Sequence, residues 1–356
     1  MRIQRFVLHG TVLYLMCTVA FLASCREQPP VEVGEPVRPI GQVIDIEVPL
    51  GLPEVPVPAD NPLTTETIAL GRQLFYGSIL PIETGPSCAN CHDPQHSFSQ
   101  GQPGGAASGR HTPALINAAY WTTLFWDGRA SSLEDVHLGS ADDPPHGLQG
   151  IVDRLNTDGT YAGLFEKAFG PGPVTLEKTA KAIAAFERTI LGGNSAFDRY
   201  FYGGDQSALS EEAKLGLEVF RDPKRGNCAA CHAFNDDHAL FSDNEFHNSG
   251  VAVGPDGELV DLGRFEVTGV DAHRGAFRTP SLRNVSSTAP YMHDGSLKDL
   301  KAALDFYIGA GNSSPWHDPE LHELDFLTGP ERAGLLAFLE SLTGELPPSV
   351  GSPESQ

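Results

Sequence analysis

Cys88-Ala89-Asn90-Cys91-His92 and Cys228-Ala229-Ala230-Cys231-His232 are two copies of one pentapeptide, Cys-x-x-Cys-His. Two thiols three residues apart on one helical turn reach the two vinyl groups of one porphyrin, and the adjacent histidine then points at the iron. A Cys-x-x-Cys pair alone would also suit a redox pair or half a zinc site, but the following histidine favours c-type haem. We therefore expect two covalent haems, with His92 and His232 as axial iron ligands.

The cysteine count agrees with this interpretation. Of six cysteines, four belong to the two motifs, and the others are Cys17 and Cys25 near the N-terminus. No disulfide framework is left over. A zinc site would need four ligands at each motif, and the motifs lie 140 residues apart.

The N-terminus has the pattern of an export signal. Arg2 and Arg5 precede an apolar run that ends in Leu22-Ala23-Ser24-Cys25. Residues 1–24 therefore read as a signal peptide rather than a membrane span. The final four residues also resemble a lipobox, in which Cys25 becomes lipidated, although ordinary cleavage nearby is the alternative. A lipid on Cys25 predicts a periplasmic protein anchored to the outer membrane, without a spanning segment.

The chain is strongly acidic, with a formal net charge of −22, which becomes −24 when the signal and its two arginines are removed. Such a charge disfavours binding to nucleic acid or anionic lipid, and it would attract a basic partner. The simpler alternative is that the charge only keeps the protein soluble. The remaining roughly 330 residues suggest two domains.

A second pattern recurs after each haem motif and predicts a tandem duplication. It reads Thr-Pro-x-Leu-x-Asn, then Asp-Gly, then Leu. The intervals from Thr to Asp and from Gly to Leu are fifteen and five residues in both copies. We infer two homologous haem domains. The copies are Thr112, Leu115, Asn117, Asp127, Gly128, Leu133 and Thr279, Leu282, Asn284, Asp294, Gly295, Leu300.

Strand signals are sparse and helical periodicity recurs, so the predicted fold class is mostly α, as two tandem cytochrome c-like domains with long connecting loops. A Pro-rich stretch favours extended backbone, as a tether or a strap over the surface. The predicted segments are a tether at 25–62, domains at 63–205 and 206–345, and a disordered tail at 346–356. The predicted helices run from Thr175 to Leu191, from Ser210 to Phe220 and from Pro330 to near Gly344.

The sixth ligand of each iron decides the chemistry, because an open position permits peroxide chemistry and a filled one favours electron transfer. Ser296 is expected to cap a helix that presents Tyr307 on an apolar face. An inward aromatic residue is more often packing than a ligand. The only methionine outside the signal is Met292. Tyr307 and Met292 are therefore rival sixth ligands of the second haem. The apolar face consists of Leu297, Leu300, Leu304 and Tyr307.

Three further stretches, together with the haem motifs, resemble the bacterial dihaem cytochrome c peroxidase superfamily over roughly residues 60–343. They are Phe125-Trp126-Asp127-Gly128-Arg129, Arg278-Thr279-Pro280-Ser281-Leu282-Arg283-Asn284 and Ala289-Pro290-Tyr291-Met292-His293-Asp294-Gly295.

The resemblance implies roles for particular residues. Trp126 would lie between the haems, and the first haem would react with hydrogen peroxide. Tyr307 stands where conventional members have a methionine, which is typical of the MauG-like branch and favours Tyr307 as ligand. The loop at 101–105 has no histidine to close the iron opposite His92. Among MauG-like proteins the chain is similar to the methanobactin-operon dihaem enzymes, which oxidise a tryptophan of a partner copper protein.

Several positions depart from the family pattern. Val136 and His146 stand where the branch usually has a glutamine and a catalytic glutamate, and Gly226 replaces a surface tryptophan. His146 is a candidate general acid and base for peroxide cleavage, or else a plain surface histidine in a turn.

The resemblance also implies a calcium ion between the domains. It would be held by the carbonyls of Thr288 and Pro290, yet His111 replaces its usual asparagine ligand. Imidazole is a poor ligand for calcium, so its coordination here is an open question.

The sequence thus predicts a periplasmic, peroxide-dependent dihaem oxidoreductase that forms a high-valent two-haem state and oxidises a side chain of a partner protein. One alternative is a conventional peroxidase fed by a small cytochrome or cupredoxin. Another is a lipid-anchored dihaem electron carrier without catalysis.

Overall fold

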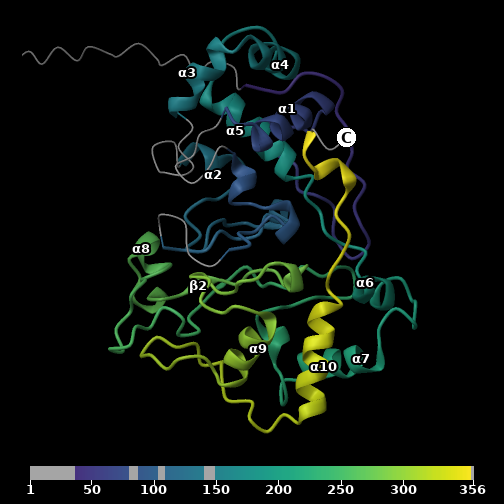
Figure 1. The fold of residues 1–356 in the computed structure, drawn as a ribbon, viewed down its shortest axis with the longest axis vertical. Coiled ribbons are helices and arrows are strands. Elements are labelled where there is room, and N and C mark those ends of the chain that lie inside the picture. The colour runs from purple at the N-terminus through teal and green to yellow at the C-terminus, as the bar shows by residue number, and fades with distance from the viewer. Residues whose placement is uncertain (1–36, 80–86, 103–108, 140–148, 354–356) are drawn as a thin grey trace, which may run out of the picture. The chain divides into compact units, whose positions relative to one another are not determined.

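The backbone is mostly helical, as predicted (Figure 1), and the computed structural model describes residues 37–79, 87–102, 109–139 and 149–353. Within these residues the only sheet is one antiparallel pair, β1 (Phe246–His247) and β2 (Phe277–Arg278). Val37–Gln356 form one compact unit. The signal, Cys25 and His146 lie outside the described residues.

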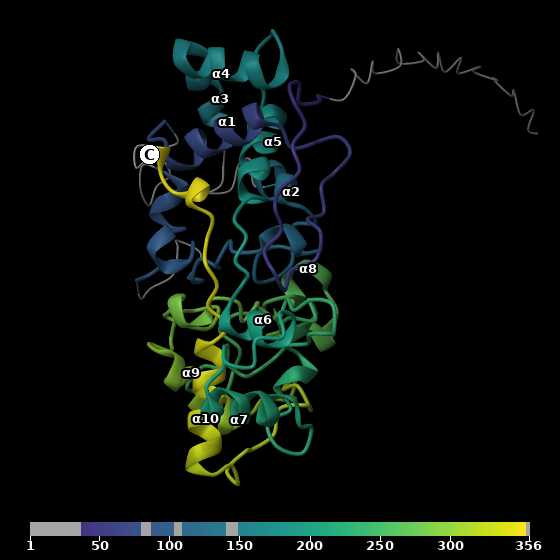
Figure 2. The ribbon, with the colours of Figure 1, turned by 90° about the vertical axis from the view of Figure 1, so that its right-hand side faces the viewer.

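Two helical lobes follow one another along the chain, and Figures 1 and 2 show them at opposite ends of this unit. We call α1–α5 with the Cys88 motif the first lobe, and α6–α10 with the Cys228 motif the second lobe. The first lobe has α1 (Thr65–Tyr76), α2 (Leu133–Gly139), α3 (Gln149–Thr157), α4 (Gly159–Phe169) and α5 (Leu176–Glu187). The second has α6 (Ala196–Phe201), α7 (Glu211–Arg221), α8 (Phe265–Thr268), α9 (Leu300–Ile308) and α10 (Gly329–Glu340).

The helix termini agree closely with the predictions. Thr175 caps α5 by accepting from Lys178 N, and Ser210 caps α7 by accepting from Ala213 N. Such side-chain oxygens satisfy amides that have no partner inside the helix. The first of these helices ends at Glu187, four residues before the predicted Leu191, because the chain tightens into turns there.

Each lobe is built on one close helix crossing at a glycine. A Cβ atom on Gly71 of α1 would lie 1.9 Å from the carbonyl oxygen of Ala182 in α5. A Cβ atom on Gly216 of α7 would lie 1.9 Å from the carbonyl oxygen of Gly334 in α10. Only glycine allows these backbones to approach so closely, so the duplication extends to the packing of the main helices.

Asn117 and Asn284 occupy matching positions in the two repeats and make matching hydrogen bonds. Both residues have left-handed backbone, with φ of 60° and 56°. Each precedes a short 3₁₀ turn, η3 (Ala118–Tyr120) and η6 (Val285–Ser287). The side chain of Asn117 bonds both backbone groups of Gly192, and that of Asn284 bonds both of Gly344. Asparagine tolerates this conformation better than most residues.

The described part of the Pro-rich segment, residues 37–62, is a strap that contacts both lobes. Asn61 is fully buried and donates from Nδ2 to Lys181 O of the first lobe at 3.0 Å. In the second lobe, the carbonyl oxygen of Gly51 accepts from the guanidinium of Arg283 at 2.7 Å and from Ala239 N at 2.9 Å. Residues 37–62 are therefore part of the folded body, not a free tether.

The C-terminal residues correct a prediction. Residues 346–353 were expected to be disordered, but η7 (Pro348–Val350) packs on the first lobe, where Val350 is 3% exposed. The Tyr76 hydroxyl donates to Val350 O at 2.7 Å, and Arg72 Nε donates to Gly351 O at 2.6 Å. Packing of Leu346 and Val350 on the core of the first lobe, together with these hydrogen bonds, anchors the segment.

The domain boundary expected at 205/206 also lies too late. Phe197 of α6 is fully buried and packs with Phe220, Phe241 and Phe338 in the core of the second lobe. The helix α6 therefore belongs to the second lobe, although it precedes the expected boundary.

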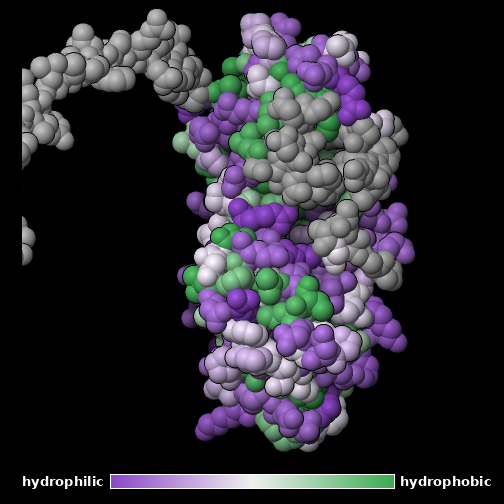
Figure 3. All heavy atoms as spheres, turned by 90° about the vertical axis from the view of Figure 1, so that its left-hand side faces the viewer, coloured by the Kyte–Doolittle hydropathy of each residue, from purple (hydrophilic) through white to green (hydrophobic). Residues whose placement is uncertain are grey.

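The surface is largely hydrophilic, with scattered apolar patches. Figure 3 shows one such patch on the face that carries α8. Val260, Val267 and Val270 are exposed apolar residues near this helix along the chain. None of the helices in the described ranges is both long and apolar enough to cross a bilayer.

Candidate haem centres

The two haem-attachment motifs adopt the same local structure. Each begins with a 3₁₀ turn, η1 (Cys88–Asn90) or η4 (Cys228–Ala230). The amide of His92 donates to Cys88 O, and that of His232 donates to Cys228 O, both at 2.9 Å. These bonds fold each histidine back over its first cysteine. The four cysteines are free of disulfides, as haem attachment requires.

Both histidines are oriented for iron ligation. His92 Nδ1 lies 3.0 Å from Phe98 O, and His232 Nδ1 lies 2.9 Å from Phe241 O. Burial lowers the pKa of both imidazoles, so they are neutral near pH 7. A neutral imidazole that donates from Nδ1 leaves the Nε2 lone pair free for a metal. The residues at both motifs therefore fit c-type haem.

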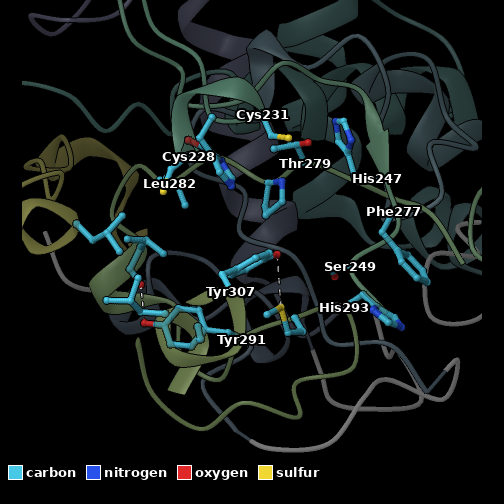
Figure 4. A pocket seen from close by; sticks show the side chains of 18 of the residues that line it. Cys228, Cys231, His247, Ser249, Phe277, Thr279, Leu282, Tyr291, His293 and Tyr307 are labelled. Atoms are coloured by element: carbon cyan, nitrogen blue, oxygen red, sulfur yellow. Dashed lines mark hydrogen bonds between the residues drawn. The ribbon is translucent and has the colours of Figure 1, made fainter. Parts of the chain in front are cut away.

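A cavity beside the second motif extends to the junction of the lobes. Its walls include Cys228 and Tyr307 of the second lobe (Figure 4). His232 and Met292 also line it, as does Trp126, which lies between α1 and α2 in the sequence. Such a concave, mostly apolar space with a few polar groups is typical of a cofactor site.

Tyr307 faces this cavity from α9, as its predicted apolar helix face requires. Leu300 and Leu304 line the cavity with it. Burial raises the pKa of the Tyr307 phenol, although a hydrogen bond with Ser249 opposes this shift. The predicted cap was wrong: Asp299 caps α9 by accepting from Ala302 N. Ser296 precedes the helix because the next residue, Leu297, pairs with Tyr291.

Met292, the rival sixth ligand, lines the same cavity. The Tyr307 hydroxyl lies 3.9 Å from the Met292 sulfur, and Figure 4 shows this contact as a dashed line. Met292 has left-handed backbone with a φ of 73°, which is uncommon for a non-glycine residue. Both predicted sixth ligands of the second haem, Tyr307 and Met292, therefore lie in one cluster of side chains.

Trp126 lies where the two lobes meet. Its indole nitrogen donates to the carbonyl oxygen of His111 at 2.7 Å, and its own carbonyl accepts from Arg278 N at 2.9 Å. The ring also lines the cavity. Backbone groups on both sides therefore fix the position of Trp126.

An ion-pair network beside Trp126 was not predicted as part of the site. Asp127 is 4% exposed and accepts from Arg110 at 2.6 Å and from Arg129 at 2.9 Å. Arg110 also bonds both carboxylate oxygens of Asp261 at 2.7 Å. The network joins the lobes through buried charges, which are strong when hydrogen-bonded in this way. The feature of the sequence that could have indicated this ion-pair network is the Asp-Gly-Arg stretch directly after Trp126.

A second unpredicted cluster consists of Cys231, Asp243 and His247. His247 lies 2.9 Å from Asp243 and 2.5 Å from Asp318. The bond with Asp243, and then those with Cys231 and Asp318, raise the pKa of His247 to about 11. Because Cys231 belongs to a haem-attachment motif, this cluster is better explained as support for that motif than as a metal site.

The expected calcium ion stays a prediction. Thr288 and Pro290 line the cavity, but the His111 imidazole lies 2.5 Å from Gln100 O. Among the residues that the structure describes, no cluster of three acidic, histidine or cysteine ligands gathers there. Calcium prefers six to eight oxygen ligands; the carbonyls of Thr288 and Pro290 would supply two, and the remaining ligands stay a prediction.

Of the remaining predicted positions, Val136 is partly buried against the core of the first lobe. His146 and most of the loop at 101–105 lie outside the described residues, as does Cys25. Their predicted roles stay predictions.

Two oriented histidines, two pairs of attachment thiols and duplicated helical lobes define a dihaem c-type cytochrome. Comparison with known proteins identifies its family. The pattern of the family described as di-haem cytochrome c peroxidase matches residues 65–207. The methylamine utilization protein MauG of Methylorubrum extorquens is 38% identical over 309 residues, which cover 84% of each chain.

More distant relatives agree. The cytochrome c551 peroxidase of Pseudomonas aeruginosa is 31% identical, over 81% of each chain. The crystal structure of a MauG-like protein associated with microbial copper homeostasis has a TM-score of 0.75 at 30% identity, covering 88% of this chain and 99% of that chain. The chain belongs to the di-haem cytochrome c peroxidase and MauG family, and it is a peroxide-dependent oxidoreductase.

Proposed function

We propose that this protein uses hydrogen peroxide to oxidise a side chain of a partner protein, as the MauG-like interpretation of its sequence predicts. The observation that carries the proposal is that Tyr307 of α9 lines the same cavity as His232 and Cys228. A phenol oxygen is an anionic iron ligand that stabilises oxidised iron, whereas a thioether stabilises reduced iron.

Each lobe contributes its own histidine ligand to the proposed reaction. When bound, the haems supply peroxide cleavage at one iron and storage of oxidising equivalents at both. His92 and His232 hold their ring protons on Nδ1 for Phe98 and Phe241, which increases the basicity of each ligand.

Trp126 provides an aromatic step between the lobes, with its indole N–H held by His111 O. A substrate as large as a protein would give up electrons from outside the cavity. His146 remains the predicted group for moving the proton between the peroxide oxygens.

Export and lipidation are part of the proposal. The leader and the Leu-Ala-Ser-Cys sequence place the enzyme in the periplasm, held to the outer membrane through Cys25. Metabolic labelling with a radioactive fatty acid tests this. The Cys25→Ser variant should lose the label, and a label that persists in it would contradict lipidation of Cys25.

The ligand assignment is tested by Tyr307→Phe with Met292→Leu as its matched control. Electron paramagnetic resonance of the ferric protein should change at the second haem in Tyr307→Phe and stay as in wild type in Met292→Leu. On titration with peroxide, Tyr307→Phe should lose the state in which both haems are oxidised. Retention of that state would defeat the assignment.

A conventional peroxidase is the second candidate, and one observation favours it. The sulfur of Met292 lies beside the Tyr307 hydroxyl, and the Pseudomonas aeruginosa relative is a cytochrome c551 peroxidase. Steady oxidation of a reduced small cytochrome or cupredoxin by peroxide, abolished in Met292→Leu and not in Tyr307→Phe, would establish this candidate instead.

A further inference from the structure

Arg278 is a buried cation with almost no partners. The residue is 5% exposed, and its one side-chain hydrogen bond to the described residues runs from Nη1 to the backbone oxygen of Thr279 at 3.2 Å. Its Nε atom is buried without any partner. No carboxylate of the described residues pairs with it.

The other two buried arginines of the described residues, and the partly buried Arg110 at the same junction, are paired with carboxylates. Arg188 forms two bonds with Glu134, at 2.7 and 2.8 Å. Arg283 forms two with Asp198, at 2.6 and 2.9 Å. Arg110 bonds Asp127 and Asp261. Arg278 is thus the exception, although it lies only five residues from Arg283 in the same motif.

The isolation of Arg278 is energetically costly. Removing an ion from water without a counter-ion costs several kcal/mol even after relaxation of the protein. Burial lowers the pKa of Arg278 to about 10, so the guanidinium is still charged at pH 7. It stands 5.1 Å from the centre of the Trp121 ring, but an aromatic face offers a weaker attraction than a carboxylate does. An anion is needed to balance this charge.

The position of Arg278 indicates where that anion comes from. Arg278 lines the cavity that also contains Cys228, Cys231 and His232. Its backbone amide donates to Trp126 O, so it sits at the junction of the lobes. Each haem carries two propionate carboxylates, and a haem attached at Cys228 and Cys231 would occupy this cavity with its own propionates.

We propose that the guanidinium of Arg278 binds a haem propionate at the junction of the two lobes, next to Trp126. A planar guanidinium matches a carboxylate in two parallel hydrogen bonds. Arg278 is a positioning residue: it holds the porphyrin edge and places a positive charge beside it. The propionate belongs to one of the two haems, and the test below distinguishes them.

The test uses Arg278→Gln and Arg278→Lys in the intact dihaem protein. Resonance Raman spectra of the ferric protein report propionate bending, and spectroelectrochemistry reports both midpoint potentials. In Arg278→Gln we expect one propionate band to shift and one haem to become harder to reduce, because a nearby positive charge is lost. The expected change is about tenfold in the oxidation equilibrium, or ~59 mV for one electron. The affected potential, assigned by the absorption bands of each haem, identifies the source.

The matched control is Arg274→Gln. Arg274 also lies over aromatic rings, 3.9 Å from the centre of Phe265, but it is paired with Asp271 and partly exposed. This control should leave both readouts unchanged. If Arg278→Gln also leaves them unchanged, the proposal is wrong.

Arg278→Lys keeps the charge but loses the paired hydrogen bonds, so its Raman band should shift while its potential changes less. If Arg278→Gln does not fold, Arg278→Lys tests the proposal instead. An unshifted propionate Raman band in Arg278→Lys would then overturn the proposal. Neither readout needs peroxide or a partner, so failure of the proposed function would not affect this result.

Discussion

In the first lobe His92 is fastened to Phe98 O, and in the second His232 is fastened to Phe241 O, at nearly the same distance. The helix that follows each Asp-Gly pair also begins at the matching leucine, α2 at Leu133 and α9 at Leu300. The lobes differ seven residues later. The second has Tyr307, whereas the sequence of the first has Ser140 at that position.

Under the proposed function, this difference would turn two copies of one repeat into two kinds of haem centre. The histidine side is kept in both lobes because it must hold the iron. Under the proposed function the opposite side differs at this one position of the repeat, because a phenol oxygen can bind iron whereas a serine hydroxyl is a weak ligand. A sixth ligand for one iron therefore requires few changes in the repeat.

The largest effect is expected from removing either pair of attachment thiols. Cys88→Ala/Cys91→Ala and Cys228→Ala/Cys231→Ala should each keep one covalent haem, so the haem content measured by pyridine haemochrome spectra falls by half. The first variant should lose its reaction with peroxide, and the second should still react but oxidise no partner. The reverse outcome would exchange the roles of the lobes.

The glycine crossings should be the most sensitive packing positions. Gly71→Ala and Gly216→Ala would each place a Cβ atom 1.9 Å from a backbone oxygen. We expect each to destabilise the protein by about 3 kcal/mol or more, because overpacking a core forces backbone shifts. Denaturant unfolding measures this.

Gly163→Ala in α4 is the control for these variants. No atom lies within 4 Å of its added Cβ, so alanine should be neutral or stabilise by about 0.5–1 kcal/mol. Equal effects at all three glycines would contradict the packing argument.

Because of Glu134, we expect the free energy of unfolding of the first lobe to depend on pH. Burial alone would raise the pKa of Glu134, but its hydrogen bonds and charge interaction with Arg188 lower it overall. The contribution of Glu134 to the free energy of unfolding is fully present above its pKa in the unfolded chain, near 4.5. It is lost as the pH falls through the lower pKa of Glu134 in the folded protein. Glu134→Gln leaves Arg188 unpaired and should cost about 3 kcal/mol at pH 7.

In acid the difference between Glu134→Gln and wild type should shrink, because below about pH 4.5 the unfolded wild-type chain binds a proton at Glu134 that the folded chain binds only at lower pH. Unfolding free energies measured at pH 7 and pH 3 check this. A constant difference at both pH values would mean that the ion pair does not carry the effect.

The smallest effect is expected where the C-terminal segment meets the first lobe. Tyr76→Phe removes the donor to Val350 O and should cost about 1 kcal/mol. Hydrogen exchange should become faster in residues 346–353, while peroxide reactivity stays unchanged. Unaltered exchange there would show that Arg72 and apolar packing hold the segment by themselves.

Much of this architecture was predictable because it depends on local sequence. The haem motifs, the repeated Thr-Pro-x-Leu-x-Asn pattern and the caps at Thr175 and Ser210 each act within a few residues. The cap of α9 was mispredicted because Leu297 pairs with Tyr291 instead of continuing the helix. Such a choice depends on a neighbouring loop rather than on local preference.

The long-range features could not be predicted from the sequence. The unpaired state of Arg278 and the full pairing of Arg283 depend on which carboxylates the fold brings near, and the two arginines stand in one short motif. The anchoring of Val350 depends on a first-lobe surface nearly three hundred residues earlier, at Tyr76.

The packing of Val350 on the first lobe also bears on the order of assembly. Residues 346–353 leave the ribosome only after the whole second lobe has been made, so the first lobe cannot be finished while the chain is still emerging. Its core therefore stays uncovered on that side until these residues have been made, so the first lobe completes its packing only after the second lobe has been synthesised.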